Sequence, residues 1–255
     1  MITENYNDLV TVICLTSPSP CHPDTRIIDE TLASVRHWFP TAPIYILADG
    51  VRPELEYRRW QYHDYLLKLA SQLPSNFYMF PVKDHSHQTA MVKNALPHVK
   101  TPLLLFIEQD LPIRTDPGVD IDWQMMADAI LSGSVDLCRL MLHESVHPEH
   151  LHLYQGQIAG YPHLWKQRQF SGWTHLASTE MYKRLLLDFD MRAKIMVERY
   201  VGRVIEARPW EDFKLTSYIP DPAASRRIYH LHGRGGVDGG ADDPTFVETE
   251  VYPPK

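Results

Sequence analysis

The stretch that decides the fold runs from Leu103 to Ile113 and reads LLLFIEQDLPI. Its first five residues are all apolar, which is typical of a strand buried on both faces of a sheet. Two carboxylates, Glu108 and Asp110, follow directly. The stretch therefore predicts a central strand that ends in an acidic, polar segment.

Upstream, further apolar runs alternate with helical patterns. The expected strands are VTVICLT (10–16), PIYILA (43–48) and residues 77–82, and apolar residues at helical spacing predict helices over 25–39, 54–73 and 89–96. This alternation predicts a parallel or mostly parallel sheet with helices on both faces, so the expected fold class is α/β. Ligands of such sheets bind at the carboxyl ends of the strands, where Thr16, Ser17, Asp49 and Glu108 lie.

The second half of the chain has a less regular pattern. We expect helices over 121–132, 178–189, 192–203 and 211–218, and strands over 136–142 and 226–231. The stretch 143–170 is rich in His, Tyr, Gln and Pro, and it predicts loops with one short strand.

Composition and charge narrow the classes of protein that fit. The chain of 255 residues has a net charge of -7 and no long run of Lys or Arg, which disfavours bulk nucleic-acid binding. Its three cysteines, Cys14, Cys21 and Cys138, form no disulfide framework. The N-terminus lacks a signal-peptide pattern, and the apolar run 103–107 is far shorter than the roughly 20 residues that span a membrane. We therefore expect a cytoplasmic protein without a membrane span.

The spacing of Glu108 and Asp110 suits a divalent cation. Residues i and i+2 of an extended segment face the same way, so both carboxylates are expected to point at one spot. Two carboxylates held together are unfavourable unless a cation or a proton lies between them. Mg²⁺ and Mn²⁺ prefer oxygen ligands and commonly link carboxylates to substrate phosphates. The alternative is that both residues are solvated at the end of a strand.

Residues 10–115 resemble, in order, the family 2 glycosyltransferases and their GT-A relatives. The expected second strand runs into ILADG, which is similar to the family's Asp-Asp-Gly-Ser, and the resemblance implies that Asp49 contacts the nucleotide base. VKNAL is similar to the family's Ala-Arg-Asn, which points to Lys93 and Asn94 as donor contacts. The family's Asp-x-Asp is Glu-x-Asp here. The resemblance thus implies Asp110 as a metal ligand and Glu108 as a contact of the ribose or donor sugar.

The resemblance also implies one GT-A, Rossmann-like domain over residues 1–255. Residues 10–115 would bind a nucleotide sugar, with Thr16 and Ser17 holding the nucleotide, and residues 116–255 would bind the acceptor and include a C-terminal Gly-rich loop. The implied donor is a nucleotide diphosphate sugar, UDP-sugar first, and the implied cofactor is Mn²⁺ or Mg²⁺. The implied enzyme is a hexosyl- or pentosyltransferase that inverts the anomeric configuration.

Glu211 and Asp212 lie in ARPWEDFKLTSYI, at the start of an expected short helix. Carboxylates are favoured at a helix N-terminus, so capping is one explanation. In inverting GT-A enzymes an Asp of a late Glu-Asp pair removes the proton from the acceptor hydroxyl. The resemblance therefore implies Asp212 as the catalytic base, with Glu211 as the second candidate. Such a base has to lie within hydrogen-bond reach of the acceptor oxygen.

His230 and His232 lie two residues apart in the run IYHLHGRGG. On an extended segment their side chains face the same way, which suits a metal site. Many GT-A enzymes use a late His as a further metal ligand, and the resemblance implies His232 or His230 for that role. Arg234 and the surrounding glycines suit a loop that closes over a diphosphate, and a flexible surface loop is the alternative.

Two other features of the second half are less specific. Four histidines, at positions 143, 147, 150 and 152, match no defensible zinc pattern and are expected in a solvated or acceptor-facing loop. Trp173, within FSGWTH, is either part of a sugar-stacking wall for the acceptor or a core residue.

The sequence leaves other functions open. A nucleotidyltransferase would share the sheet and the acidic metal ligands, but its Gly-rich basic phosphate loop is replaced by SPSPCHP at 17–23. A metal-dependent hydrolase built on the histidines would need no nucleotide, and a sugar-binding module would need no late Glu-Asp pair. For a transferase, the acceptor stays open among a glycan, a lipid-linked sugar, a small metabolite, a protein and a modified nucleic-acid base.

Overall fold

The apolar runs form the centre of the molecule. The computed structural model describes residues 6–146, 152–206 and 208–231. In it, β1 (Val10–Thr16) pairs with β4 (Leu103–Glu108), and both strands are buried almost throughout. β2 (Ile44–Ala48) and β3 (Phe77–Pro81) continue the sheet on the other side of β1, and these four strands are all parallel. The expected N-terminal strands are confirmed.

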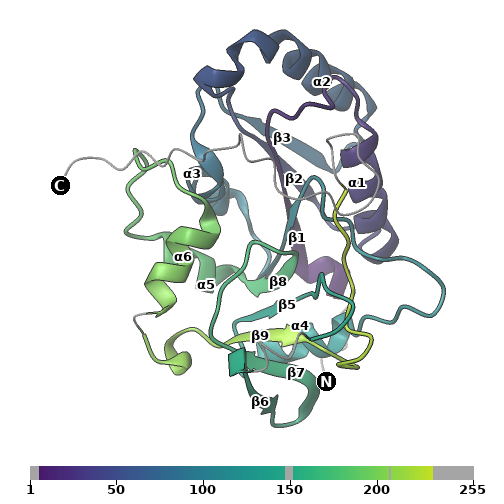
Figure 1. Ribbon diagram of the computed structural model, residues 1–255, viewed down its shortest axis with the longest axis vertical. Coiled ribbons are helices and arrows are strands. Elements are labelled where there is room, and N and C mark those ends of the chain that lie inside the picture. The colour runs from purple at the N-terminus through teal and green to yellow at the C-terminus, as the bar shows by residue number, and fades with distance from the viewer. Residues whose placement is uncertain (1–5, 147–151, 207, 232–255) are drawn as a thin grey trace.

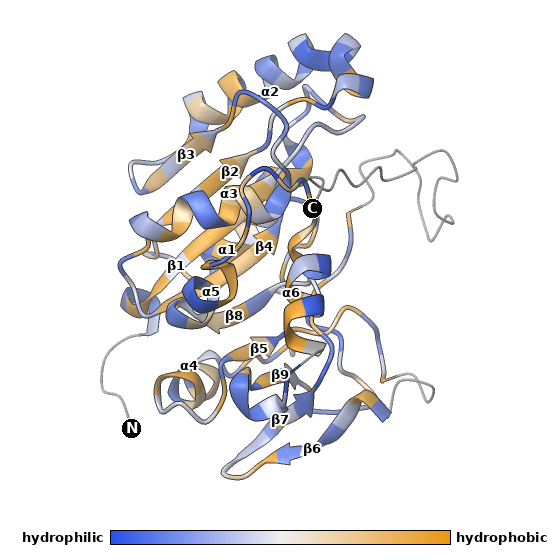
Figure 2. Ribbon diagram, turned by 90° about the vertical axis from the view of Figure 1, so that its left-hand side faces the viewer, coloured by the Kyte–Doolittle hydropathy of each residue, from blue (hydrophilic) through white to orange (hydrophobic). Residues whose placement is uncertain are grey.

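Alternate side chains of the sheet enter two separate hydrophobic cores. On β4, Leu105 and Ile107 pack in one core, and Leu104 and Phe106 pack in the other. Helices α1 (Arg26–Trp38), α2 (Arg59–Gln72) and α4 (Trp123–Leu131) cover the first core; α3 (His87–Ala95), α5 (Thr179–Leu186) and α6 (Val197–Glu206) cover the second. Figures 1 and 2 show the apolar strands enclosed between helices, which is the predicted α/β arrangement.

The second half of the chain extends the same sheet. The order of the described strands is β3-β2-β1-β4-β8-β5-β9-β7-β6. β8 (His175–Ser178) is antiparallel to both β4 and β5 (Leu137–Arg139), and β9 (Leu215–Tyr218) is parallel to β5. β6 (Tyr154–Ile158) and β7 (Tyr161–Gln167) form an antiparallel pair at the end. The sheet is therefore parallel in its N-terminal part and mixed beyond β4.

Several expectations for this half are wrong. The stretch 211–218 is not a helix, because η5 (Trp210–Asp212) leads into β9, whose backbone is paired with β5 on one side and β7 on the other. The stretch 143–170 holds two strands instead of one, and β8 was not expected at all. In each case, pairing with strands distant in sequence overrides a weak local preference.

Helix boundaries also shift. The expected helix over 54–73 begins as a 3-10 helix, η2 (Pro53–Arg58), and the one expected over 192–203 begins only at Val197. Two more 3-10 helices, η1 (Tyr6–Leu9) and η3 (Leu96–His98), precede β1 and β4. None of the helices in the described ranges is long and apolar enough to cross a membrane.

The strand expected over 226–231 is not formed; this run makes only isolated bridges, one of them to the segment that follows β4. An isolated antiparallel bridge joins Ile113 to Ile228, and Leu231 N–H donates to the Asp110 carbonyl at 2.8 Å. The pairing brings the end of the described chain back to the acidic segment after β4.

Gly50 allows two loops to approach closely, and this predicts a large effect of a single methyl group. A Cβ at Gly50 would lie 2.2 Å from the Asp84 carbonyl carbon and 2.4 Å from the His85 nitrogen. Because both atoms belong to the backbone, we expect Gly50→Ala to lower the free energy of unfolding by about 2 kcal/mol or more. Urea denaturation followed by circular dichroism measures this.

The matched control is Gly202→Ala, since a Cβ at this glycine of α6 would meet nothing within 4 Å. It should be neutral or stabilise by up to about 1 kcal/mol, because Ala is the better helix former. Equal stability of Gly50→Ala and wild type would contradict the tight approach of these loops.

Candidate functional site

The carboxyl ends of β1, β2 and β4 are level with one another. Thr16 pairs with Ala48, and Leu15 pairs with Glu108, so the residues that follow these strands meet at one edge of the sheet. This is the edge at which parallel α/β sheets bind ligands. Asp49, Gln109 and the acidic pair all lie there.

Asp49 is buried and its carboxylate is fully engaged inside the protein. It accepts hydrogen bonds from the backbone N–H groups of Gly50 and Ser86, both at 2.8 Å, and of His87 at 3.2 Å. Gly50 and Ser86 donate to Oδ1, whereas Oδ2 accepts from His87 and lies 2.8 Å from His85 Nδ1. Burial by itself would raise the pKa of Asp49, but His85 and the backbone donors outweigh it and lower the pKa. Asp49 therefore organises the turn before α3, and the expected contact with a nucleotide base finds its oxygens already occupied.

Thr16 and Ser17 hold the segment after β4 through Gln109. The Thr16 hydroxyl bonds to the Gln109 side chain and to Tyr65 Oη, the latter at 2.9 Å. Gln109 Nε2 donates to the Ser17 carbonyl at 3.4 Å, and the Thr31 hydroxyl donates to the Gln109 carbonyl at 2.6 Å. Thr16 is buried and Ser17 is exposed, so only Ser17 presents its side chain to solvent. Gln109, which lies between Glu108 and Asp110, thus joins the ends of β1 and β4.

Glu108 lies beside a second carboxylate, that of Glu198. Gln88 Nε2 donates to Glu108 Oε1 at 3.1 Å. A methyl group on the buried Gly172 would lie 3.1 Å from that same oxygen and 4.0 Å from Glu198 Oε2. Glu198 stands in the first turn of α6, where the helix dipole favours a carboxylate. The sequence pattern predicts that this helix begins at residue 192, five residues too early, and so it does not indicate Glu198 as a residue of the helix N-terminus.

Asp110 and Glu108 have different partners. The chain turns after Glu108, where Leu111 N–H donates back to the Glu108 carbonyl at 3.1 Å, so the segment is not extended as expected. Asp110 Oδ2 instead lies 3.3 Å from His230 Nε2, and both side chains are partly exposed. His232 and Arg234 lie outside the described residues. Within the described ranges, His, Cys, Asp and Glu do not gather in groups of three or more that could hold a metal. Among the described residues, Asp110 and His230 are thus a pair of side chains of the types that bind metal ions.

Lys93 does not face this edge. It belongs to the last turn of α3, and its ammonium group donates to the carbonyls of Leu187 and Phe189 at 2.8 and 2.9 Å. Asn94, next to it, is exposed. Lys93 and Asn94 were expected to contact a donor. Lys93 instead joins α3 to the end of α5. The opposite end of α3, at Gln88, is the one that reaches Glu108.

Glu211 and Asp212 lie at the opposite edge of the sheet from Glu108. Leu215 of β9 lies opposite Leu137 of β5, Leu137 lies opposite Ala177 of β8, and Ala177 lies opposite Leu104 of β4. These four residues mark one level across the strands. Asp212 precedes this level, whereas Glu108 lies four residues beyond it, about 13 Å along the strands, with three interstrand steps of about 4.8 Å in between. A base at that distance cannot reach an acceptor bound beside Glu108. The assignment of Asp212, or of Glu211, as the base is corrected on this ground.

Trp173 and Arg139 form the floor of the region next to Glu198. The Arg139 guanidinium lies 4.7 Å from the centre of the Trp173 ring and donates to Ser217 Oγ at 3.2 Å. Burial lowers the pKa of Arg139 to about 10, while Tyr154 and the Glu198 carboxylate oppose this shift. Arg139 therefore stays charged at neutral pH. The Trp173 ring is partly exposed, and His143 meets it edge-on at 5.1 Å.

The remaining histidines of that cluster do not form a site in the described part of the chain. His147 and His150 lie outside it, and His152 is exposed. The described residues thus give no support to a hydrolase built on this cluster.

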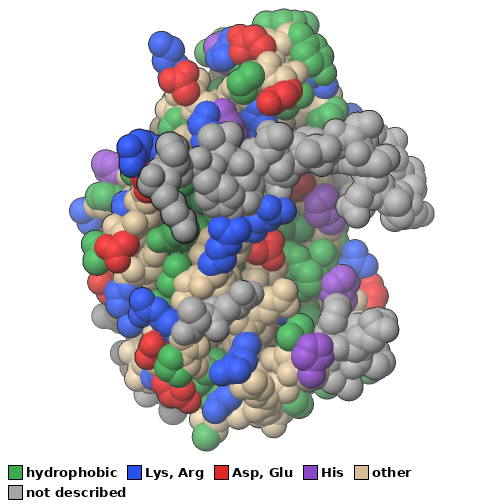
Figure 3. Space-filling model, turned by 60° about the vertical axis from the view of Figure 1, so that its left-hand side comes forward, with side chains coloured by type: hydrophobic (Ala, Val, Ile, Leu, Met, Phe, Trp, Pro, Cys, Tyr) green, Lys and Arg blue, Asp and Glu red, His purple; other side chains and the backbone are tan. Residues whose placement is uncertain are grey.

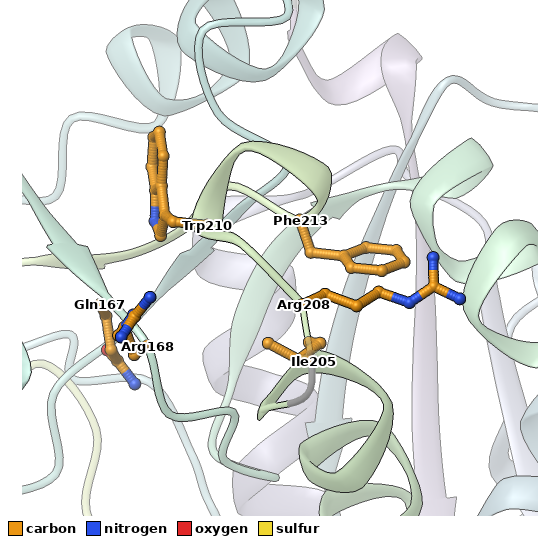
Figure 4. Close-up of a pocket in the computed structure, with 6 residues that line it drawn as sticks. All are labelled: Gln167, Arg168, Ile205, Arg208, Trp210 and Phe213. Atoms are coloured by element: carbon orange, nitrogen blue, oxygen red, sulfur yellow. The ribbon is translucent and has the colours of Figure 1, made fainter.

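A pocket of about 200 Å³ has Trp210 and Phe213, the neighbours of Glu211 and Asp212 in the chain, in its lining. It is lined by residues of β7, the end of α6 and the segment before β9, namely Gln167, Arg168, Ile205, Arg208, Trp210 and Phe213. Figure 4 shows the side chains of Arg168 and Arg208 extending to opposite sides of it, so their charges do not converge on one ligand. In Figure 3, the Lys and Arg side chains of the described residues are likewise scattered among acidic and apolar ones. These arrangements do not suit a nucleic-acid groove on the face shown.

The sheet order and the site at its carboxyl edge define the fold as that of the GT-A type glycosyltransferases. The structure of GalNAc-T7 with UDP, GalNAc and Mn²⁺ is similar with a TM-score of 0.55 at 12% identity, over 94% of this chain and 46% of that one. S. aureus TarS 1-349 is similar with a TM-score of 0.53 at 12% identity, over 87% of this chain and 60% of that one. The chain thus spans about half the length of the structures it resembles. No protein-family model matches the sequence, and neither does any curated protein.

The carboxylate of Asp49 predicts a pH-dependent contribution to stability. Because its folded-state pKa lies below the ordinary 3.8, the contribution is present above that value and is lost as the pH falls through the folded pKa. Asp49→Asn should unfold about 2 kcal/mol more easily than wild type at pH 7, because an amide cannot accept all of these hydrogen bonds. The difference should shrink below pH 4 in urea titrations.

Asp64→Asn, which removes a carboxylate paired with Lys68 on the surface of α2, is the control. It should stay within about 0.5 kcal/mol of wild type at every pH. A gap between Asp49→Asn and wild type that does not change with pH would argue against an ionised Asp49.

Proposed function

We propose that this protein is a glycosyltransferase that uses a nucleotide diphosphate sugar, a UDP-sugar first, and a divalent cation. The observation that carries the proposal is the contact between Asp110 and His230 directly after β4, at the carboxyl edge of a GT-A sheet. The fold by itself supports only the general class, because one fold hosts many functions. The side chains at the edge supply the chemistry that the class needs.

Asp110 and His230 are the proposed cation ligands. A carboxylate oxygen and an imidazole nitrogen 3.3 Å apart are donors that Mn²⁺ accepts, and the phosphates of a donor can complete its coordination. The cation, when bound, neutralises the charge that develops on the departing diphosphate. Ser17 and Gln109 border the same edge from β1 and β4, where a nucleotide would lie.

Glu198 is the proposed catalytic base, in place of Asp212. Its carboxylate lies near that of Glu108, on the side of the sheet that α3 and α6 cover. The Glu198 carboxylate interacts electrostatically with the buried guanidinium of Arg139, so a cation lies near the proposed base. Glu198 would take the proton of an acceptor hydroxyl as that oxygen attacks the anomeric carbon, and such a single displacement inverts the configuration there.

The acceptor would lie over Trp173. The indole is partly exposed, with Arg139 over its ring and His143 beside it, and indole rings are side chains on which sugar rings stack. In this proposal residues 10–115 bind the donor and the described part of 116–255 supplies the acceptor side through Trp173 and α6.

Substitution of Asp110 tests the cation site. Isothermal titration should show UDP binding to wild type that strengthens at least tenfold when Mn²⁺ is present. Asp110→Asn should lose this Mn²⁺ effect, because its side chain no longer offers an anionic ligand. Asp116→Asn, a change of an exposed carboxylate on the same connection, is the matched control and should bind like wild type. Failure of wild type to bind UDP, GDP or other nucleotides would refute the proposed function.

Substitution of Glu198 tests the base. Glu198→Gln should lower the rate of donor turnover about 100-fold or more, since general base catalysis contributes this much, and should leave the affinity for UDP with Mn²⁺ within about twofold. The rate is measured as UDP release from a panel of UDP-sugars. Asp212→Asn should turn over like wild type. The opposite pattern, an inactive Asp212→Asn and an active Glu198→Gln, would return the base to Asp212.

A further inference from the structure

Gln88 links the Glu108 carboxylate to the first residue of the helix that carries Glu198, through its side-chain amide. Its Nε2 donates to Glu108 Oε1 at 3.1 Å, and its Oε1 accepts from the backbone N–H of Val197 at 3.4 Å. Val197 is the first residue of α6 and directly precedes Glu198. One side chain therefore touches the end of β4 and the start of the helix that carries the proposed base.

An amide suits both contacts because it carries a donor and an acceptor. The Glu108 carboxylate needs a donor, and the N–H at the start of α6 needs an acceptor because it has no partner within the helix. A Glu at position 88 could accept from Val197 but would place a second carboxylate against Glu108. An apolar side chain would satisfy neither group.

Hydrogen bonds of the residues next to Gln88 hold the first turn of α3 in place. Asp49 accepts hydrogen bonds from Ser86 and His87, the two residues before Gln88, and Gln88 N–H donates to His87 Nδ1 at 3.0 Å. Thr89, the next residue, is buried and donates to the Ile195 carbonyl at 2.7 Å. The first turn of α3 is thus tied to the end of β2 on one side and to the segment before α6 on the other.

We propose that Gln88 is a positioning residue that sets the distance between Glu108 and Glu198. This rests on the proposed function, in which Glu198, near Glu108, takes the acceptor proton. Because a methyl group on Gly172 would lie only 3.1 Å from Glu108 Oε1 and 4.0 Å from Glu198 Oε2, both carboxylates border this one glycine, and a small displacement of α6 changes their separation. Gln88 acts through these two carboxylates and needs no contact with substrate of its own.

The test compares Gln88→Met and Gln88→Glu with wild type. Met keeps the length and bulk of the side chain and removes both hydrogen bonds, whereas Glu keeps only the one from Val197. Both variants should lower kcat for UDP release from the donor at least tenfold, with KM for the donor and the affinity for UDP with Mn²⁺ within about twofold. Hydrogen exchange of the peptide over 197–206 should be faster in Gln88→Met.

Gln124→Met is the matched control, because Gln124 also lies on a helix and donates from its side chain, to Asp128 at 3.0 Å, but far from this edge. It should match wild type in all these measurements, which sets the background effect of such a change. Turnover of Gln88→Met at the wild-type rate, unchanged hydrogen exchange, or an equal loss of UDP affinity and turnover would overturn the inference. If wild type binds no nucleotide, the proposed function fails and the inference with it. If wild type turns over donor and Gln88→Met does so equally well, the inference alone fails.

Discussion

The parallel pairing of β1 with β4 is the interaction on which the rest of the structure depends. Both strands are buried on both faces, so their alternate side chains fill two cores, and each core draws its own set of helices onto the sheet. The register of this pairing also makes the strand ends level, with Leu15 opposite Glu108. A shift of one residue would turn every side chain to the other face, so the two cores hold the edge of the site in place.

A buried carboxylate then shapes that edge. Asp49 would be unfavourable in the interior without donors, and the backbone of the turn before α3 supplies them. Its demand for hydrogen bonds brings the turn against the end of β2, where Gly50 leaves the necessary space. Asp49 resembles a ligand contact in the sequence, but its role in the structure is to orient α3 toward Glu108.

The position of Glu198 depends on how α6 packs. Val197, Val201 and Ile205 enter the second core, and this fixes the helix with its first turn beside Glu108 and Gly172. The other late acidic pair, Glu211 and Asp212, precedes β9 and is carried to the far edge by the direction of that strand. Two acidic segments only about a dozen residues apart in the chain thus end at opposite edges of one sheet.

The sequence by itself determined the parallel strands, the helices around them and the edge that carries the acidic pair, because strong apolar periodicity and strand-end polarity are local signals. It also brought forward Asp110 and His230, which the structure places together. Only the tertiary structure decided that β8 and β9 are strands, that Lys93 faces away, and that Glu198 lies at the site while Asp212 does not. These outcomes depend on strand direction, register and the packing of α6, which arise from contacts between residues distant in the chain and leave no short-range pattern to read.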